Sequence, residues 1–314
     1  MLEYDKAIYN SALKKCMHSK IDAFILKNEN AIFHYAKINN LDIRDITKQI
    51  KLHIPQFDLS SIDNNNFFSQ NIVPILDIRF NNYAINFQNY LKKCGFDKIS
   101  NSEVLKIKDY YIVEERTHKK IIGIEVRIVD IKDAEFIESK FHYLRSFRED
   151  GIYHIGLFIE GFDTPICYMN FCQIQREYKK EVKELVQKAF GKIDFESSKM
   201  IELSRVWGCG KLPQNTISFL VSHGVKHFSN LNYEFMGTAV NPYLDFSGKS
   251  ILASNFSPFA VRPVQYQYKA NGEYVKLLSS ENKKPCLMKM PPNILYVKEM
   301  QKNKKTLPIQ IIHI

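Results

Sequence analysis

The chain has 314 residues and a mass of 36.8 kDa, which is enough for a sizeable buried core and fits two domains. Hydrophobic residues make up 45% and charged residues 25%, as in soluble globular proteins, and no run of about 18 apolar residues could cross a membrane. The N-terminus lacks the pattern of a secretory signal, and the six cysteines show neither zinc spacing nor disulfide-scaffold density, so we expect a cytoplasmic protein.

The chain is basic, with a net charge of +10 and a pI near 9.1. Most of the positive excess lies in residues 131–314. A basic protein favours an anionic partner such as nucleic acid. The many Lys, Asn and Ile residues also fit the codon usage of an AT-rich genome, which weakens this indication.

Hydrophobic periodicity predicts a mixed N-terminal region. The elements predicted up to residue 131 are helices at 4–25 and 31–50, a loop at 60–70, a helix at 82–95, and paired strands at 109–115 and 121–131. Residues 33–54 have the rhythm of a DNA-reading helix-turn-helix, although two amphipathic helices around a polar turn are more often plain packing. We place a domain boundary near residue 108.

In the second part of the chain, hydrophobic periodicity predicts a regular alternation of strands and helices. Its elements are a helix at 133–147, strands at 152–159 and 165–174, a helix at 177–190, a strand at 200–207, a helix at 216–228, a strand at 234–240, a helix at 250–256 and a strand at 264–268. This order resembles that of GNAT acyltransferases. We therefore expect an α/β protein with a GNAT-like mixed central sheet flanked by helices, in a catalytic domain at residues 109–314. An N-terminal α+β accessory domain at residues 1–108 would target the substrate.

Residues 201–223 indicate a binding site for a phosphorylated ligand. An apolar strand runs into Gly208 and Gly210, which let a backbone approach a ligand closely. A helix then begins at Asn215 and Thr216, where Asn215 is a favourable N-cap and the free amides of the first turn attract an anion. An ordinary strand, turn and capped helix is the alternative.

Three segments together resemble one family, the Mom-type DNA adenine-modifying proteins of phages, which are a divergent branch of the GNAT superfamily. The segments are SKFHYLRS with its His-Tyr pair, ELSRVW followed by PQNTISFLVS, and GTAVNPYLDFSGKSILASNF. The resemblance covers roughly residues 121–270. Asn241 stands where the family usually has an acid, and Phe246 and Ser247 replace its Gly-His pair.

The resemblance implies transfer of a small acyl-derived group to the N6 amine of adenine in DNA, which protects the DNA from restriction. The donor would be acetyl-CoA or a related acyl carrier. The implied catalytic residues are His142, Tyr143, Asn241 and Tyr243. The implied donor-binding residues are Ser204, Arg205, Val206, Gly208, Gly210, Asn215, Thr216, Ser218 and Asn255. A rim that contacts DNA phosphates would comprise Arg145, Arg148, Lys249 and Arg262.

The chemistry of these residue types is compatible with that implication. The N6 amine is a poor nucleophile, so a proton acceptor is needed, and His142 is a base near neutral pH. A base inside a duplex must be flipped out, and Tyr153 or Trp207 could stack on it. Arg205 lies in an apolar strand, where its charge requires a partner such as Glu202. No metal-ligand spacing is readable.

Two other functions remain open from the sequence. One is a GNAT N-acyltransferase that acts on an amine of a small molecule, RNA or protein. The other is a DNA-binding protein without catalysis, which the missing acid at Asn241 would explain.

Overall fold

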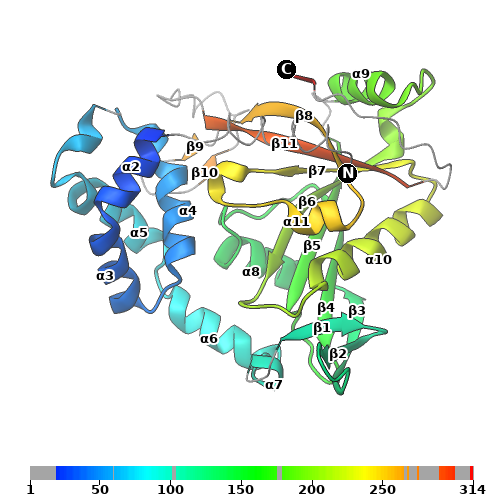
Figure 1. Cartoon of the computed structure of the whole chain (residues 1–314), viewed down its shortest axis with the longest axis horizontal. Coiled ribbons are helices and arrows are strands. Elements are labelled where there is room, and N and C mark those ends of the chain that lie inside the picture. The colour runs from blue at the N-terminus through cyan, green and yellow to red at the C-terminus, as the bar shows by residue number, and fades with distance from the viewer. Residues whose placement is uncertain are drawn as a thin grey trace.

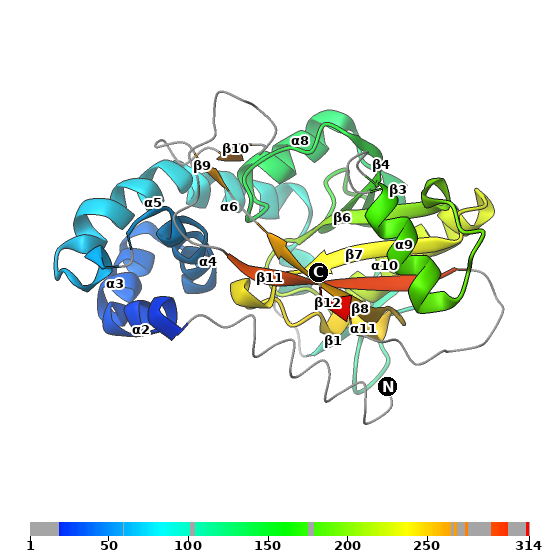
Figure 2. The ribbon, with the colours of Figure 1, turned by 90° about the horizontal axis from the view of Figure 1, so that it is seen from above.

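The computed structural model describes residues 19–58, 60–100, 104–174, 179–264, 267–268, 274–275, 290–300 and 312–313. Within them, ten strands form one mixed sheet with helices around it (Figures 1 and 2). In spatial order these strands are β1 (Leu105–Lys108), β2 (Tyr111–Glu114), β3 (Lys120–Ile128), β4 (Gly151–Ile159), β5 (Cys167–Gln173), β6 (Met200–Gly208), β7 (Phe235–Val240), β11 (Met290–Glu299), β8 (Ser257–Val264) and β12 (Ile312–His313). A separate pair consists of β9 (Gln267–Tyr268) and β10 (Tyr274–Val275). The predicted α/β class is confirmed.

The helices fall into an N-terminal group and a group that connects the strands. The first group is α2 (Ser19–Lys27), α3 (Glu29–Asn39), α4 (Ile43–His53), α5 (Val73–Arg79), α6 (Tyr83–Lys93) and α7 (Asp97–Ser100). The second is α8 (Ile131–Lys140), α9 (Lys179–Phe190), α10 (Thr216–Asn230) and α11 (Lys249–Ala253). Figure 1 shows α2 to α5 gathered beside one end of the sheet. Among the described residues, no helix is both long and apolar enough to span a bilayer.

The succession β3, α8, β4, β5, α9, β6, α10, β7, α11, β8 is the predicted GNAT-like order. Strands β3 to β6 pair antiparallel, whereas β6 and β7 run parallel because α10 crosses between them. Strand β11, which inserts between β7 and β8, has no counterpart among the elements predicted from the sequence. Its partners lie far away in the sequence, so only the assembled sheet reveals it.

The two faces of the sheet carry different helices. On β5, Phe171 points toward α10, where its ring contacts Phe228 at 5.0 Å. The neighbouring positions Tyr168 and Asn170 point the other way and contact Glu138 of α8. This alternation follows from the period of two in a strand. The candidate site lies on the α8 face, whereas the α10 face is mainly apolar.

The N-terminal helices pack into the rest of the fold. The segment predicted as a helix at 31–50 is divided into α3 and α4, because Asn40 ends α3 in a left-handed conformation. The proposed DNA-reading helix α4 is buried along its second half, from Gln49 to His53. Five consecutive residues cover all sides of this half, which leaves it no face for a major groove, so the structure favours the alternative of plain packing. The predicted helix at 4–25 lies partly outside the described residues.

The expected boundary near residue 108 falls inside a hairpin. Strands β1 and β2 pair antiparallel across a turn at Asp109 and Tyr110, both of which have positive φ. In addition, β1 bonds to the loop before α10, where the amide of Ile107 donates to Gln214 O at 3.0 Å. A division at residue 108 would therefore cut a continuous set of backbone hydrogen bonds.

Candidate active site

The His-Tyr pair lies on a loop, not on a helix. The predicted helix at 133–147 ends at Lys140, and His142 and Tyr143 follow in the loop that leads to β4. The two rings contact each other, with their centroids 4.4 Å apart. Tyr143 also contacts the ring of Phe246 at 5.0 Å. The first and third family segments therefore meet in space at these two aromatic rings.

His142 is buried and neutral. Burial lowers its pKa well below the ordinary value, and the charges of Arg205, Arg145 and Lys48 act in the same direction. Its Nδ1 accepts from the amide of Leu144 at 3.3 Å. A ring nitrogen that accepts a hydrogen bond carries no proton, so the proton of the neutral ring lies on Nε2. His142 is thus arranged as a hydrogen-bond donor, which corrects its expected role as a base.

A buried hydrogen-bond network supports this loop from the sheet. Glu138 is fully buried, and its Oε1 accepts from the Tyr168 hydroxyl and the Asn170 amide, both at 2.8 Å. Its Oε2 accepts from the backbone amide of Arg148 at 2.7 Å. His154 completes the network, with its Nδ1 2.6 Å from the Tyr168 hydroxyl. One carboxylate therefore ties α8, β5 and the end of the His-Tyr loop together.

The N-terminal helices hold the other end of the loop. Gln49 of α4 donates to the Tyr143 carbonyl at 2.8 Å, and Arg79 of α5 donates to the Leu144 carbonyl at 3.0 Å. Arg79 also donates to the Gln49 side chain at 3.0 Å. The sequence analysis missed these residues. It also missed Glu138, although a carboxylate on the same helical face as Ala134 and Ile137 was a readable signal.

Strands β6 and β7 separate at the candidate site. They pair from Met200 to Leu203, and the remainder of β6 has no partner on that side among the described residues. A bulge at Ser204 marks the separation, since Phe171 pairs with Leu203 and Asn170 pairs with Arg205. Val206 and Arg205 are half-buried on this unpaired part. The open strand edge can bond an extended chain such as the arm of an acyl carrier.

Arg205 is placed beside the His-Tyr loop, but not as expected. Glu202, its predicted partner, instead pairs with Arg148 at 3.0 Å. None of the ion pairs between described residues includes Arg205, whose Nη1 donates to the Ser204 carbonyl at 3.0 Å. Its Nε is buried without a partner. A guanidinium without an ion-pair partner favours the binding of an anion or a polarised carbonyl between the separated strands β6 and β7.

The Gly-rich loop differs from the expectation of close ligand approach. A Cβ at Gly208 would lie 2.3 Å from the Leu212 side chain, and one at Gly210 would lie 3.2 Å from the Phe96 ring. The glycines therefore admit the protein's own side chains. Asn215 also does not cap α10 with its side chain and instead adopts a left-handed conformation. Asn215 thus stands at the predicted N-cap position but without the expected side-chain bond. The amide of Thr216 donates to the Pro213 carbonyl at 3.3 Å, and the later amides of the first turn are left for another acceptor.

The remaining residues of this segment bond to the backbone. The hydroxyl of Thr216 donates to the Pro213 carbonyl at 2.7 Å, and that of Ser218 donates to the Asn215 carbonyl at 3.1 Å. Ser218 is only half-buried, whereas Thr216 is buried. The separated strands β6 and β7 and the start of α10 are the places that could hold an acyl carrier, and Asn215 and Ser218 are the residues that could hold its phosphates.

The third segment supports the fold around the site. Asn241 is buried and accepts from the amide of Tyr243 at 3.1 Å, which starts the short helix η6 (Pro242–Leu244). The hydroxyl of Tyr243 donates to the Lys51 carbonyl of α4 at 3.1 Å. Asn255 is exposed and left-handed after α11. None of these contacts joins Asn241, Tyr243 or Asn255 to His142.

The expected DNA-binding rim is dispersed. Arg148 lies in ion pairs with Asp150 at 2.9 Å and Glu202 at 3.0 Å, with only 11% of its side chain exposed. Arg262 pairs with Glu181 of α9 at 3.4 Å. Lys249 is exposed at the start of α11, and Arg145 lies in the His-Tyr loop. Among these four, only Arg145 is next to the site.

The expected stacking residues are partly buried and already stack on rings of the protein itself. Trp207 stacks on Phe141 with centroids 5.5 Å apart, and Tyr153 stacks on His227 of α10 at 4.0 Å. Tyr153 therefore lies on the opposite face from His142. Among the described residues, no group of His, Cys, Asp and Glu side chains is arranged to hold a metal ion.

The region that contains the candidate site matches a known protein family. The sequence profile of the Mom protein family matches residues 123–289, which include the His-Tyr loop, β6 and α10. The chain belongs to the Mom protein family. The match begins in β3, so the N-terminal helices that hold the His-Tyr loop lie outside it.

Solved structures give a weaker similarity. One is yncA, a putative acetyltransferase from Salmonella typhimurium with its cofactor acetyl-CoA, at 10% identity and a TM-score of 0.37 over 58% of this chain and 96% of that chain. Another is an N-acetyltransferase from Staphylococcus aureus Mu50, at 9% identity and a TM-score of 0.37 over 57% and 99%. TM-scores of this size establish no shared fold, so the fold assignment rests on the sheet itself. No curated protein sequence matches the chain.

Proposed function

We propose that this Mom family member is a transferase that moves a small acyl-derived group to the N6 amine of adenine in DNA. The observation that carries the proposal is the split between β6 and β7 beyond Leu203, with Arg205 on the unpaired strand and the His-Tyr loop beside it. The DNA substrate comes from the resemblance to Mom-type adenine-modifying proteins. The proposed donor is acetyl-CoA or a related acyl carrier, which supplies an activated carbonyl carbon.

In this proposal the protein binds the two substrates, orients the adenine ring and polarises the carbonyl of the donor. Neutral His142 would donate from Nε2 to a developing oxyanion, which a neutral imidazole of low pKa can do without becoming charged. Arg205 would add a fixed positive charge on the same side. Tyr143, which is half-buried between His142 and Phe246, would position the adenine ring. As the C–N bond forms, the C–S bond of the carrier would break, and the proton of the attacking amine would pass through solvent to the leaving thiolate.

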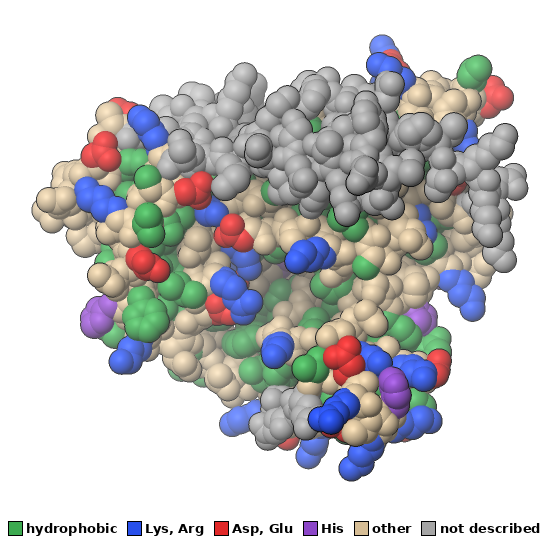
Figure 3. All heavy atoms as spheres, in the orientation of Figure 1, with side chains coloured by type: hydrophobic (Ala, Val, Ile, Leu, Met, Phe, Trp, Pro, Cys, Tyr) green, Lys and Arg blue, Asp and Glu red, His purple; other side chains and the backbone are tan. Residues whose placement is uncertain are grey.

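The surface beside the start of α10 supports an anionic partner. Exposed Lys108, Arg116, Lys119 and Lys120 lie in and around the β1–β2 hairpin, where Figure 3 shows Lys and Arg gathered at the lower end of the molecule. The same hairpin bonds to Gln214, next to Asn215. A basic surface adjacent to the proposed donor site favours DNA over a small neutral amine.

The test is expression in a restriction-free bacterial host, followed by digestion of the DNA to nucleosides and mass spectrometry. We expect a heavier deoxyadenosine with the natural protein and with Arg44→Gln, and none with Arg205→Gln. Arg44 is a suitable control because it is an exposed arginine paired only with its neighbour Asp42. Unmodified DNA from a soluble natural protein would refute the proposal. Salt-dependent duplex binding without modification would then favour a non-catalytic DNA-binding protein.

A further inference from the structure

A pocket opens between the N-terminal helices and the His-Tyr loop, on residues that the family match only partly covers. It has a volume of about 270 Å³, near the lower limit for small-ligand sites. It is lined by Ile78, Arg79, Asn81, Asn82, Tyr83, Asn86, Ser139, Lys140, Phe141 and Arg145. The lining contains three cationic side chains, three amides and no carboxylate. This composition selects an anion that accepts many hydrogen bonds.

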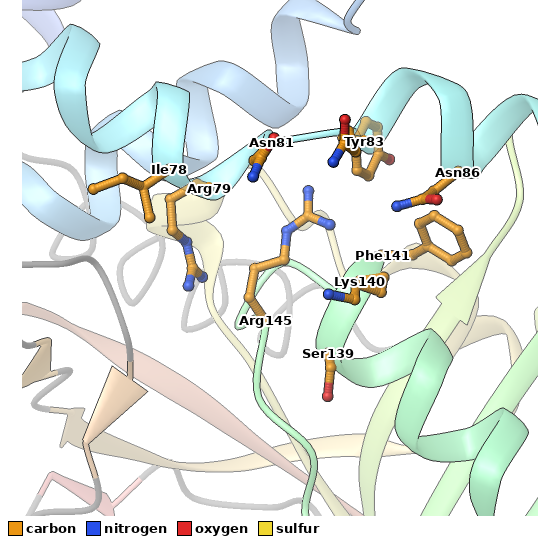
Figure 4. Close-up of a pocket in the computed structure, with 10 residues that line it drawn as sticks. Ile78, Arg79, Asn81, Tyr83, Asn86, Ser139, Lys140, Phe141 and Arg145 are labelled. Atoms are coloured by element: carbon orange, nitrogen blue, oxygen red, sulfur yellow. The ribbon is translucent and has the colours of Figure 1, made fainter.

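Arg145 is the central cation of the pocket. Its guanidinium lies over the Tyr83 ring, 4.4 Å from the centroid, and over the Phe80 ring at 5.3 Å. Figure 4 shows it rising between Asn81 and Tyr83, with Asn86 beside the same space. Its Nε is buried without a hydrogen-bond partner, although the side chain as a whole is half-buried. Asp45 and Tyr83 stabilise its charge in part, but no ion pair between described residues includes it. A largely desolvated guanidinium without a contacting carboxylate is suited to receive an anion.

Two features of the backbone point in the same direction. Arg145 has a φ of 51°, a left-handed conformation that costs a residue with a side chain about 1 kcal/mol or more. The left-handed backbone directs the Arg145 side chain into the pocket, and such strain is common at ligand-binding residues. Asn82, at the start of α6, is also left-handed and makes no side-chain cap. The amide of Tyr83 donates to the Phe80 carbonyl at 2.9 Å, so only the later amides of the first turn are left for an anion.

We propose that this pocket binds a phosphodiester group of the DNA strand that carries the target adenine. The inference rests on the proposed function and assigns part of the DNA contact to the N-terminal helices. Arg145 also connects the pocket to the site, because its amide donates to the His142 carbonyl at 2.9 Å. A phosphate held here would position the strand beside His142 and Tyr143.

The test is a comparison of Asn86→Asp with Asn89→Asp. Both changes add one negative charge to α6, but Asn86 lines the pocket and Asn89 is exposed outside it. Binding of a fluorescent adenine-containing duplex would be measured at several salt concentrations. We expect Asn86→Asp to bind about tenfold more weakly and to lower the slope of log affinity against log salt by about one, with Asn89→Asp close to the natural protein.

The outcomes separate the pocket from the proposed function. If the natural protein binds and modifies DNA but the two variants behave alike, the pocket inference is overturned and the proposed function stands. A second outcome is that the natural protein does not bind DNA, while inorganic phosphate raises the melting temperature of the natural protein but not that of Asn86→Asp. This outcome would overturn both the DNA-modifying function and the phosphodiester ligand, and it would identify the pocket as a site for free phosphate. Asn86→Asp is preferred to a change at Arg145, whose loss would also remove the packing on Tyr83.

Discussion

Replacement of Glu138 by alanine tests whether the buried network positions the His-Tyr loop. The change removes the acceptor for Tyr168, Asn170 and the Arg148 amide at once. Removal of one partner of a buried charged network costs about 3–5 kcal/mol. At about 2 °C per kcal/mol for a chain of this length, the melting temperature should fall by about 6–10 °C. Glu135→Ala, on the exposed face of the same helix, should change it by less than about 1 °C.

Activity separates positioning from stability alone. A displacement of about 1 Å at a reacting group lowers the rate by roughly 100-fold, so we expect Glu138→Ala to lose DNA modification at temperatures where it is still folded. Glu138→Gln should recover part of both properties, because the Tyr168 hydroxyl and the Asn170 amide can each reverse their hydrogen bonds. Melting temperatures from circular dichroism and modification rates from mass spectrometry would be compared. A folded Glu138→Ala protein with full activity would refute the reasoning.

The other predictions concern the pH dependence, the core and the third segment. Burial, together with the charge of Arg79, lowers the pKa of His53 from 6.5 to about 3. The unfolded chain therefore binds the extra proton below pH 6.5, and stability should fall with pH from there toward 3, by at most about 1.4 kcal/mol per unit from this residue. His53→Gln should flatten the decrease of melting temperature with pH, and an unchanged slope would contradict this assignment. Gly224→Ala should destabilise α10 by about 1–3 kcal/mol in urea unfolding, since the new Cβ would lie 2.5 Å from the Phe171 ring. Gly224→Ala would instead be neutral if Phe171 can move aside. Tyr243→Phe should cost about 1 kcal/mol through the lost bond to the Lys51 carbonyl and retain modification activity. Loss of activity at unchanged stability would restore Tyr243 as a catalytic residue.

The arrangement around His142 shows how the N-terminal helices contribute to the site. Gln49 and Arg79 bond to the backbone of the His-Tyr loop. Burial lowers the pKa of His142 most, and the charges of Arg205, Arg145 and Lys48 add to this effect. These helices lie before the region matched by the family profile. Their contacts are therefore a property of this chain that the family segments alone do not contain.

The sequence by itself determined the local elements and their order. Periodicity identified β4, β5, β6, α10 and β7 within a few residues, because each element is set by its own alternation of apolar and polar side chains. Gly95, with a φ of 67°, ended α6 as predicted, since the left-handed conformation is a local requirement. The three family segments were likewise readable from short stretches of sequence.

Only the tertiary structure decided which of these residues act together. The partners of Glu138 lie 10 to 32 positions away in the chain, and β11 pairs with β7 at separations of 54 to 64 positions. The helix at 133–147 ended at Lys140, since the following residues bond to α4, α5 and back to α8, and helix propensity could not predict those contacts. Asn215 likewise has the composition of an N-cap, but its conformation is set by the packing of the loop before it. Roles that depend on long-range contacts are fixed by the folded chain as a whole, since a local pattern carries no information about which distant group will approach it.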